Sequence, residues 1–352
     1  MNVELLQQII LVLVASSFIV VAGIAARRGR LSFGIASLWT GIGAIGAIGA
    51  LLIPAVDEVG AILGVVPAAV LAGAASLVLA VIAFSLSLRV SALEAAAQSA
   101  IEAIGMAGAT SPRRSDEEPD TLVIVPALNE ARSVGGVVTG LHEAGLSVLV
   151  IDDGSTDGTS QAARDAGAGV ITLPSNLGVG GALRTGFRYA AEHGYSRVVQ
   201  CDGDGQHPPD AVLSILAASA ASEQTHLLIG SRFTDLRSRR EEGFIRWSAL
   251  SLLGWIASRA AGRRITDATS GLRVVRRPLL EEFARKLPRH YLGDTFEAIV
   301  STARAGFVIG EHPVTMTDRL HGVSTATWSA AVGLTLRAAA VTVLGLHRRF
   351  DR

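Results

Sequence analysis

Cysteine and charged residues are both scarce in this chain of 352 residues. A single cysteine, Cys201, excludes an internal disulfide framework and fits a reducing compartment. Its place in an apolar run favours a small core residue over a nucleophile. Lysine plus arginine and aspartate plus glutamate number 31 each, so the net charge of zero gives no general argument for binding nucleic acid. Only 18% of residues are charged and 49% are hydrophobic, which is too apolar for a wholly soluble protein and predicts a membrane region.

Several widespread site signatures are also missing. The glycines match neither the Gly-x-Gly-x-x-Gly dinucleotide fingerprint nor a phosphate-binding loop that ends in Gly-Lys-Ser/Thr. There is no His-Glu-x-x-His sequence, and the eight histidines show no metal-binding spacing. The sequence therefore argues against these dinucleotide, P-loop and zinc sites.

Three uncharged apolar stretches lie at 5–26, 31–53 and 61–88. Each is long enough to cross a bilayer, which takes about 20 residues per helix. A signal peptide is the competing interpretation of the first stretch, but it requires positive charge before the apolar run, and here the arginines follow it. We therefore expect a transmembrane domain of three helices over residues 1–90. This pattern resembles small three-helix bacterial membrane proteins of unknown function.

The arginines predict the orientation of these helices. Positively charged residues concentrate on the cytoplasmic side, so the loop at 27–30 and Arg89 should lie there. The 54–60 loop carries two acids and no cation. We expect a multi-pass protein of the cell (plasma) membrane, with its N-terminus outside and everything after Arg89 in the cytoplasm.

Residues 91–120 connect this region to the remainder of the chain. Ser91 to Ile104 is alanine-rich, with apolar residues at helical spacing, and predicts a helix that leaves the membrane. Residues 105–120 contain glycine, proline, serine, arginine and four acids, a composition typical of a linker.

Short β-rich runs alternate with helical patterns from residue 121 onwards. Strands are predicted at 122–125, 147–151 and 169–173, and a fourth apolar run begins at Val198 and ends at Cys201. This alternation is typical of the α/β class, with a mostly parallel sheet and helices on both faces. Ligands of such sheets bind at the carboxyl ends of the strands, where the polar clusters of this sequence fall.

Two aspartates follow the fourth run, separated by one glycine. Alternate strand residues face the same way, so Asp202 and Asp204 can converge at the strand's end. Together with the side-chain carbonyl of Gln206 they form a set of hard oxygen ligands that suits Mg²⁺ or Mn²⁺ held with a substrate's phosphates. Taken alone, an Asp-Gly-Asp sequence is as typical of an acidic turn.

A series of short motifs places these aspartates in context. In order along the chain they are Val125–Glu130, Asp152–Thr159, Asn176–Gly180, Asp202–Pro209, Gly230–Phe233, Thr269–Arg273, Phe296–Glu297, Glu311–Val314 and Asp318–Ser324. With these motifs, residues 121–325 resemble family-2 glycosyltransferases of the GT-A fold, a nucleotide-diphospho-sugar transferase domain. The dolichyl- or polyprenyl-phosphate sugar synthases are the branch that the motifs resemble most.

The resemblance implies an inverting transfer of a sugar from a nucleotide diphosphate sugar, with GDP or UDP, to a polyprenyl phosphate at a lipid membrane. The implied nucleotide-binding residues are Pro126, Asn129, Glu130, Asp152, Asp153 and Asp202. The implied ligands of Mg²⁺ or Mn²⁺ are Asp202, Asp204 and Gln206. Catalytic roles are implied for Asp204, Arg232 and Arg273, of which the two arginines would meet phosphate or acceptor charge.

Other interpretations of individual residues stay open. Asp157 can simply cap the next helix, and Arg232 can be a solvated loop charge. Ala127-Leu128 stands where the family frequently has an aromatic residue before Asn-Glu. Thr325 stands where the family often has a lysine after Gly-x-Ser.

Two later stretches are apolar. Residues 244–261 fit a membrane-interface helix or an amphipathic core helix equally well. Residues 328–346 are expected to form an interfacial C-terminal helix within 326–352, because a central arginine such as Arg337 costs roughly 2.5 kcal/mol or more in a span.

Two other functions are weighed against this one. A glycosyltransferase with a saccharide or another cell-envelope acceptor is the first, but processive enzymes of this fold usually carry Gln-x-x-Arg-Trp, and only Arg246-Trp247 is present. The second is a catalytically silent membrane scaffold, against which the intact Asp202, Asp204 and Gln206 argue.

Overall fold

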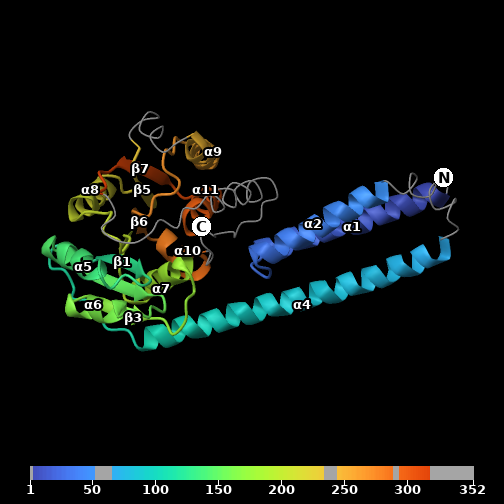
Figure 1. The fold of residues 1–352 in the computed structure, drawn as a ribbon. Coiled ribbons are helices and arrows are strands. Elements are labelled where there is room, and N and C mark those ends of the chain that lie inside the picture. Colours follow the sequence, from blue (N-terminus) through green and yellow to red (C-terminus); the bar gives the residue numbers. More distant parts are fainter. Residues whose placement is uncertain (1–2, 52–65, 234–243, 288–292, 318–352) are drawn as a thin grey trace. The chain divides into compact units, whose positions relative to one another are not determined.

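The computed structural model describes residues 3–51, 66–233, 244–287 and 293–317. The chain forms two compact units, and the boundary falls between Ala97 and Gln98. The described helices and strands follow in the order α1, α2, α4, β1, α5, β2, α6, β3, α7, β4, α8, β5, α9, β6, α10, η2, α11 and β7 (Figure 1).

Long apolar helices make up the first unit. They are α1 (Val3–Arg27), α2 (Phe33–Leu51) and the beginning of α4 (Val66–Ala107). All three are long and apolar enough to cross a membrane, over Ile9–Arg27, Phe33–Leu51 and Ser76–Ala107. The first two overlap the spans predicted at 5–26 and 31–53, whereas the third overlaps the span predicted at 61–88 and continues beyond it to Ala107.

Small residues allow α1 and α2 to pack closely. A Cβ atom on Gly43 would lie 2.7 Å from Ile19 Cγ1, so only glycine fits at this position. Aromatic rings join α4 to the pair, since Trp39 stacks on Phe18 with ring centroids 5.8 Å apart and meets Phe84 edge-on at 5.0 Å.

A seven-stranded mixed sheet forms the centre of the second unit, in the order β3-β2-β1-β4-β6-β5-β7. Its strands are β1 (Thr121–Ala127), β2 (Val148–Asp152), β3 (Gly169–Thr172), β4 (Arg197–Gln200), β5 (Leu227–Ser231), β6 (Arg273–Arg276) and β7 (Ile309–Pro313). The first four strands are parallel, as predicted, whereas β6 runs antiparallel to both β4 and β5. Valine, isoleucine and leucine dominate β1 and β2 because both faces of the sheet are covered.

Helices cover both faces of the sheet. These are α5 (Val134–Glu143), α6 (Thr159–Asp165), α7 (Val179–Glu192), α8 (Pro209–Ala220), α9 (Phe244–Ala261), α10 (Leu279–Lys286), the π-helical turn η2 (Gly293–Glu297) and α11 (Ala298–Arg304). Val123 and Val125 share one core with α5, α6 and α8. Ile124 and Ile151 face α7, which approaches closely at Gly186.

Residues 105–120 belong to the body of the second unit and are not a separate linker. Helix α4 continues to Ala107. Near its end, Gly105 packs so closely against Leu173 that a Cβ atom added to the glycine would lie 2.7 Å from Leu173 Cδ2. The chain then runs along the edge strand β3, where Thr110 N donates to Val170 O at 3.0 Å. The polar composition of this segment reflects its place at an exposed sheet edge.

The second half of α9 buries one side and exposes the other. Leu253 and Ile256 are buried, while Leu252 and Trp255 are 41% and 62% exposed. The predictions for residues 318–352, which include the last motif and the apolar stretch 328–346, lie outside the described residues.

Candidate functional site

Polar loops gather at the carboxyl ends of β1, β2 and β4. The loop after β1 carries Asn129 and Glu130, the loop after β2 begins at Asp153, and the turn after β4 carries Asp202 and Asp204. Because β2, β1 and β4 are neighbouring parallel strands, these ends share one edge of the sheet. The structure thus brings these loops together at the edge where the sequence predicts a site, and the site itself stays a prediction.

Hydrogen bonds join the first two loops. Asn129, with a left-handed φ of 57°, accepts from Thr156 N through its side-chain oxygen at 2.9 Å. Glu130 N donates to Thr159 Oγ1 at 2.9 Å, and Ala131 N donates to Asp157 Oδ2 at 3.1 Å. Asp157 also accepts from Thr159 N at 3.1 Å, so it ties the first residue of α6 to the loop after β1, although Gly158 is the N-cap residue of that helix.

The two aspartates at the end of β2 have different partners. Asp152 Oδ1 accepts from Ser155 N at 2.8 Å and stabilises its own turn. Asp153 Oδ1 accepts from Leu177 N at 2.7 Å and so joins β2 to the loop before α7. Burial raises the pKa of Asp153 to about 6, although the hydrogen bonds from Leu177 and Gly178 oppose this shift. A carboxyl with this pKa changes its charge within the working range of most enzymes.

The turn after β4 holds the predicted metal ligands. Asp204 is buried, and its Oδ1 accepts from Gln206 N at 3.0 Å. The side chain of Asp202 is 39% exposed, and its backbone N donates to His207 Nδ1 at 3.1 Å. In the part of the chain that the structure describes, no three histidine, cysteine, aspartate or glutamate side chains are grouped as a metal site.

Glycines leave room for the carboxylates around this turn. A Cβ on Gly271 would lie 2.3 Å from Asp202 Oδ2, and a Cβ on Gly203 would lie 2.1 Å from Glu130 Oε2. Neither glycine has a positive φ, so the requirement is for space and not for backbone conformation. The two contacts bring the 269–273 motif and the loop after β1 to the same turn.

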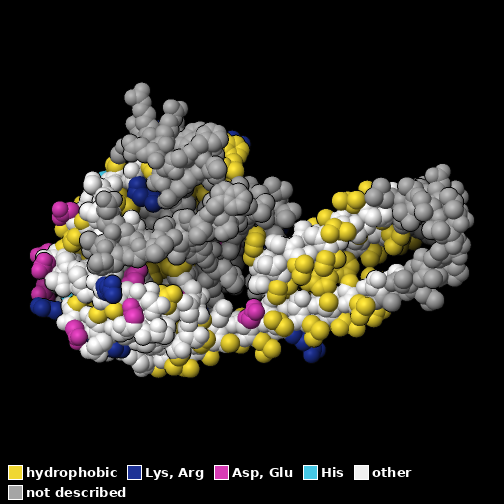
Figure 2. All heavy atoms as spheres, in the orientation of Figure 1, with side chains coloured by type: hydrophobic (Ala, Val, Ile, Leu, Met, Phe, Trp, Pro, Cys, Tyr) yellow, Lys and Arg dark blue, Asp and Glu magenta, His cyan; other side chains and the backbone are white. Residues whose placement is uncertain are grey.

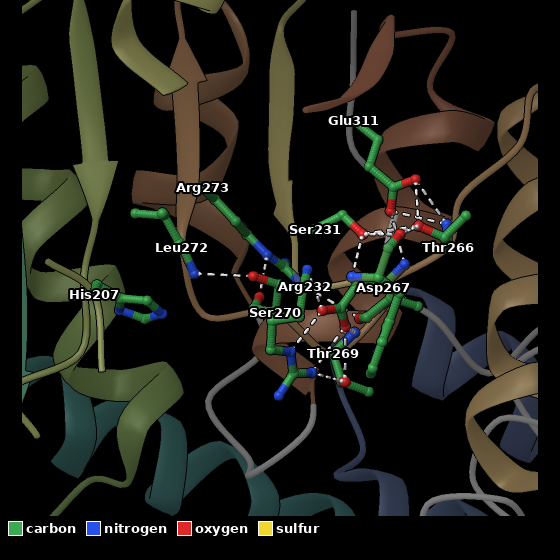
Figure 3. A network of polar contacts seen from close by, with 12 residues as sticks. His207, Ser231, Arg232, Thr266, Asp267, Thr269, Ser270, Leu272, Arg273 and Glu311 are labelled. Carbon is green, nitrogen blue, oxygen red and sulfur yellow. Dashed lines mark hydrogen bonds and ion pairs between the residues drawn. The ribbon is translucent and has the colours of Figure 1, made fainter. Parts of the chain in front are cut away.

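Arg232 lies in a polar network with the buried carboxylate of Asp267 and the half-buried carboxylate of Glu311 (Figure 3). Its Nε and Nη2 donate to the two oxygens of Asp267 at 2.7 and 2.9 Å, and Nη2 also donates to Thr269 Oγ1 at 2.9 Å. The Asp267 side chain is fully buried, whereas that of Arg232 is 31% exposed. Glu311 Oε1 accepts from Thr266 N and Asp267 N at 2.8 and 2.7 Å, which fixes the Asp267 loop.

The structure does not bring Arg273 to solvent. Its side chain is fully buried at the start of β6, and its guanidinium donates to the carbonyls of Ser270, Thr295 and Ala268 at 2.9, 3.2 and 3.4 Å. These bonds give Arg273 a structural role in the turn that carries Gly271.

Asp267 and the role of Glu311 were missed by reasoning from the sequence. One available signal was the spacing of an aspartate two residues before a threonine. This spacing occurs at Asp157-Gly158-Thr159 and again at Asp267-Ala268-Thr269, and in both places the aspartate accepts from the threonine backbone N.

Comparison with known proteins gives a consistent assignment. Residues 122–283 match the sequence profile described as "Glycosyl transferase family 2". The chain is 33% identical over 245 residues to polyprenol monophosphomannose synthase of Mycolicibacterium smegmatis, an alignment that covers 66% of this chain and 89% of that protein. It is 32% identical to undecaprenyl-phosphate mannosyltransferase of Micrococcus luteus, over 58% of this chain and 86% of that protein.

A solved structure shares the fold. Glucosyl-3-phosphoglycerate synthase from Mycobacterium tuberculosis, in complex with phosphoglyceric acid, superposes with a TM-score of 0.50 at 23% identity. The superposition covers 71% of this chain and 84% of that one. This similarity supports the mixed-sheet GT-A fold that the motifs imply.

Proposed function

Since the chain belongs to glycosyl transferase family 2, we propose that it transfers a sugar from a GDP- or UDP-sugar to a polyprenyl phosphate, with inversion at the sugar. The observation that carries the proposal is that one short turn, residues 269–271, contacts both a carboxylate, Asp202, and a guanidinium, Arg232. Gly271 lies against Asp202, and Thr269, two residues earlier, binds Arg232. A donor diphosphate needs the carboxylate turn and its metal, and an anionic acceptor needs the arginine. The names of the two relatives above, a polyprenol monophosphomannose synthase and an undecaprenyl-phosphate mannosyltransferase, support a polyprenyl phosphate as the acceptor.

The donor nucleotide is proposed to bind over the ends of β1 and β2. We propose that the Asp153 carboxylate accepts a hydrogen bond from a nucleobase N–H group, because the bond from Leu177 N holds this carboxylate in place. The cross-bonded loops at 128–131 and 153–159 fix Asn129 and Glu130 beside it. We assign Pro126, Asp152 and Asp202 to the walls of the same pocket.

A divalent cation is proposed at the turn after β4. Asp202, Asp204 and the side-chain amide of Gln206 are hard oxygen donors of the kind that Mg²⁺ and Mn²⁺ prefer. The space over Asp202, which a side chain at residue 271 would fill, fits this assignment. When bound, the ion neutralises the charge that develops on the diphosphate leaving group.

Arg232 is proposed to bind the acceptor phosphate. The planar guanidinium suits phosphate oxygens, and its pairing with Asp267 presets its orientation. A phosphate monoester is already largely dianionic near neutral pH, since its second pKa is about 6. The acceptor therefore needs no strong general base, and we assign none. We assign Arg273 the positioning of the 268–271 turn and not a contact with substrate.

The catalytic unit is proposed to lie in the cytoplasm, with α1, α2 and α4 spanning the plasma membrane. A cysteine placed near Asp57 should react with an impermeant thiol reagent in intact cells, whereas Ser111→Cys should not. The reverse labelling would overturn this orientation.

The test of the reaction is a screen of UDP- and GDP-sugars against a polyprenyl phosphate, with the product identified by mass spectrometry. We expect a sugar joined to a lipid monophosphate, and mannosyl donors are the first to try. A diphosphate-linked lipid or an oligosaccharide would favour the alternative of a saccharide or other cell-envelope acceptor. Absence of any turnover with metal, donor and lipid present would favour the silent scaffold.

A further inference from the structure

The second half of α4 carries an exposed apolar stripe, which we define as Val90, Leu93, Ala97, Ala100 and Ile104. Val90, Leu93 and Ile104 are 47%, 69% and 61% exposed, and both alanines are exposed as well. Hydrophobic side chains lie along the visible surface of α4 (Figure 2). The five residues alternate in steps of three and four, which is the spacing of positions a and d in a heptad repeat.

The membrane alone does not account for this stripe. Helix α4 has 42 residues and is therefore about 63 Å long, at about 1.5 Å per residue. The hydrocarbon core of a bilayer is only about 30 Å thick. Ile104 lies 15 residues after the exposed Arg89, or about 22 Å further along the helix. The end of the stripe thus extends well past the residue at which we expect the span to end.

Among the residues that the structure describes, packing within the chain does not use the stripe either. The side of the end of α4 that packs on the second unit is marked by Glu102, which pairs with the buried Arg184 of α7, and by Gly105. Residues two apart on a helix point in nearly opposite directions. Glu102 is two residues from both Ala100 and Ile104, so the stripe faces away from this contact.

We propose that the stripe pairs with α4 of a second copy of this chain, as a parallel two-stranded helix pair. Two copies inserted in one membrane share their orientation, so their α4 helices are parallel. Arg89 precedes Val90 and Glu94 follows Leu93, which places opposite charges at positions g and e. A parallel pair brings position g of one helix to position e of the next heptad in the other, five residues further on. Arg89 of each copy then meets Glu94 of its partner, twice in the pair.

The size of the stripe residues suits a close pair. Ala97 and Ala100 at its centre allow the two backbones to approach, while Val90, Leu93 and Ile104 supply the apolar area. The stripe and its flanking charges are therefore complementary to themselves, which a surface for an unrelated partner need not be. This pairing does not depend on the proposed reaction.

Cysteine cross-linking of the full chain tests the pairing. Ala100→Cys lies in the stripe, and the matched control Ala92→Cys replaces another exposed alanine of α4 that lies outside it. In proteoliposomes with a large excess of lipid, oxidation should give about tenfold more disulfide dimer at residue 100 than at 92, because a disulfide needs Cα atoms within about 7 Å. Equal cross-linking at both positions, monomer alone, or an adduct with a different protein at residue 100 in cells would overturn the proposal.

A charge reversal tests the parallel register. Added to Ala100→Cys, Glu94→Arg places like charges at both contacts and should reduce the disulfide dimer about fivefold at low salt. High salt should remove most of this difference by screening. If Glu94→Arg leaves cross-linking unchanged at low salt, the proposed register of the pair is wrong.

Discussion

Asp267→Asn tests whether Arg232 is held in place for an anionic acceptor. The fully buried Asp267 carboxylate accepts from Nε and Nη2 of Arg232 at 2.7 and 2.9 Å, and from its backbone N at 3.2 Å. Burial alone would raise the pKa of Asp267, but the hydrogen bonds and charge of Arg232 outweigh it and hold the pKa below its ordinary value. The carboxylate is therefore charged at neutral pH, and in this arrangement it orients the arginine and its own loop.

The expected loss follows from this geometry. Asparagine keeps the shape but offers one acceptor oxygen, so one of the two parallel bonds to Arg232 is lost together with the opposite charge. A hydrogen bond to a charged group contributes about 1.5–3 kcal/mol, and we expect the free energy of unfolding to fall by about 2 kcal/mol. A misplacement of the guanidinium by about 1 Å is enough to reduce turnover about a hundredfold. We expect kcat/KM for polyprenyl phosphate to fall by between about tenfold and a hundredfold.

Initial rates measured against each substrate in turn separate this effect from general damage. The KM for the nucleotide sugar should change little, because the hydrogen bonds of Asp267 go to Arg232, Thr269 and Glu311 and not to the loops at 128–131 and 153–159 that we assign to the donor. Asp165 is exposed and accepts from Gln161 Nε2 at 2.7 Å on the surface of α6, so Asp165→Asn is a matched control that should leave the KM of both substrates unchanged. An unchanged acceptor KM in Asp267→Asn, or equal rises for donor and acceptor, would refute the assignment of Arg232 to the acceptor.

Three further variants test the donor side. Asp204→Asn should lower turnover about a hundredfold while the fold stays intact, and EDTA should do the same to the unaltered protein. A near-normal rate in either experiment would refute the metal assignment. Gly271→Ala should weaken Mn²⁺ binding, measured by calorimetry, because the new Cβ displaces the Asp202 carboxylate; unaltered affinity would contradict this. The donor KM should rise as pH falls below about 6 in the unaltered protein, where Asp153 takes up a proton, but not in Asp153→Asn. The raised pKa means that the folded state binds this proton more tightly than the unfolded chain does. Ionised Asp153 therefore destabilises the fold above pH 6, and Asp153→Asn should raise the melting temperature at pH 7.5.

The first half of the sheet could be predicted because its strands carry their own pattern. β1, β2 and the run before Asp202 are short, β-branched and bounded by turn residues, so their parallel order and the polar edge followed from the alternation with helices. β6 lacks such a pattern, since its four residues begin and end with arginine. Its antiparallel place between β4 and β5 depends on pairings between residues 44 to 79 positions apart in the chain, which local propensity does not encode.

Composition misassigned residues 105–120 for a related reason. Polar, proline-containing segments are typical of linkers, but this one satisfies backbone groups of an edge strand, as Thr110 does at Val170. A hydrogen bond between backbones leaves almost no trace in residue type, so its partner could be found only from the structure.

The two arginines of the site show where motif reasoning ends. Arg232 and Arg273 each lie in a short motif, and the sequence gives both the same expected role toward phosphate. The structure separates them by what surrounds each guanidinium. Arg232 is partly exposed and paired with a carboxylate, so it can turn one side to a ligand. Arg273 is buried and donates to two carbonyls of the turn that ends at Gly271 and to the carbonyl of Thr295 in η2, so it can act on Asp202 through the backbone of that turn. A lysine at residue 273 could not reach carbonyls in several directions at once, so its effect should appear in metal affinity and not in acceptor KM.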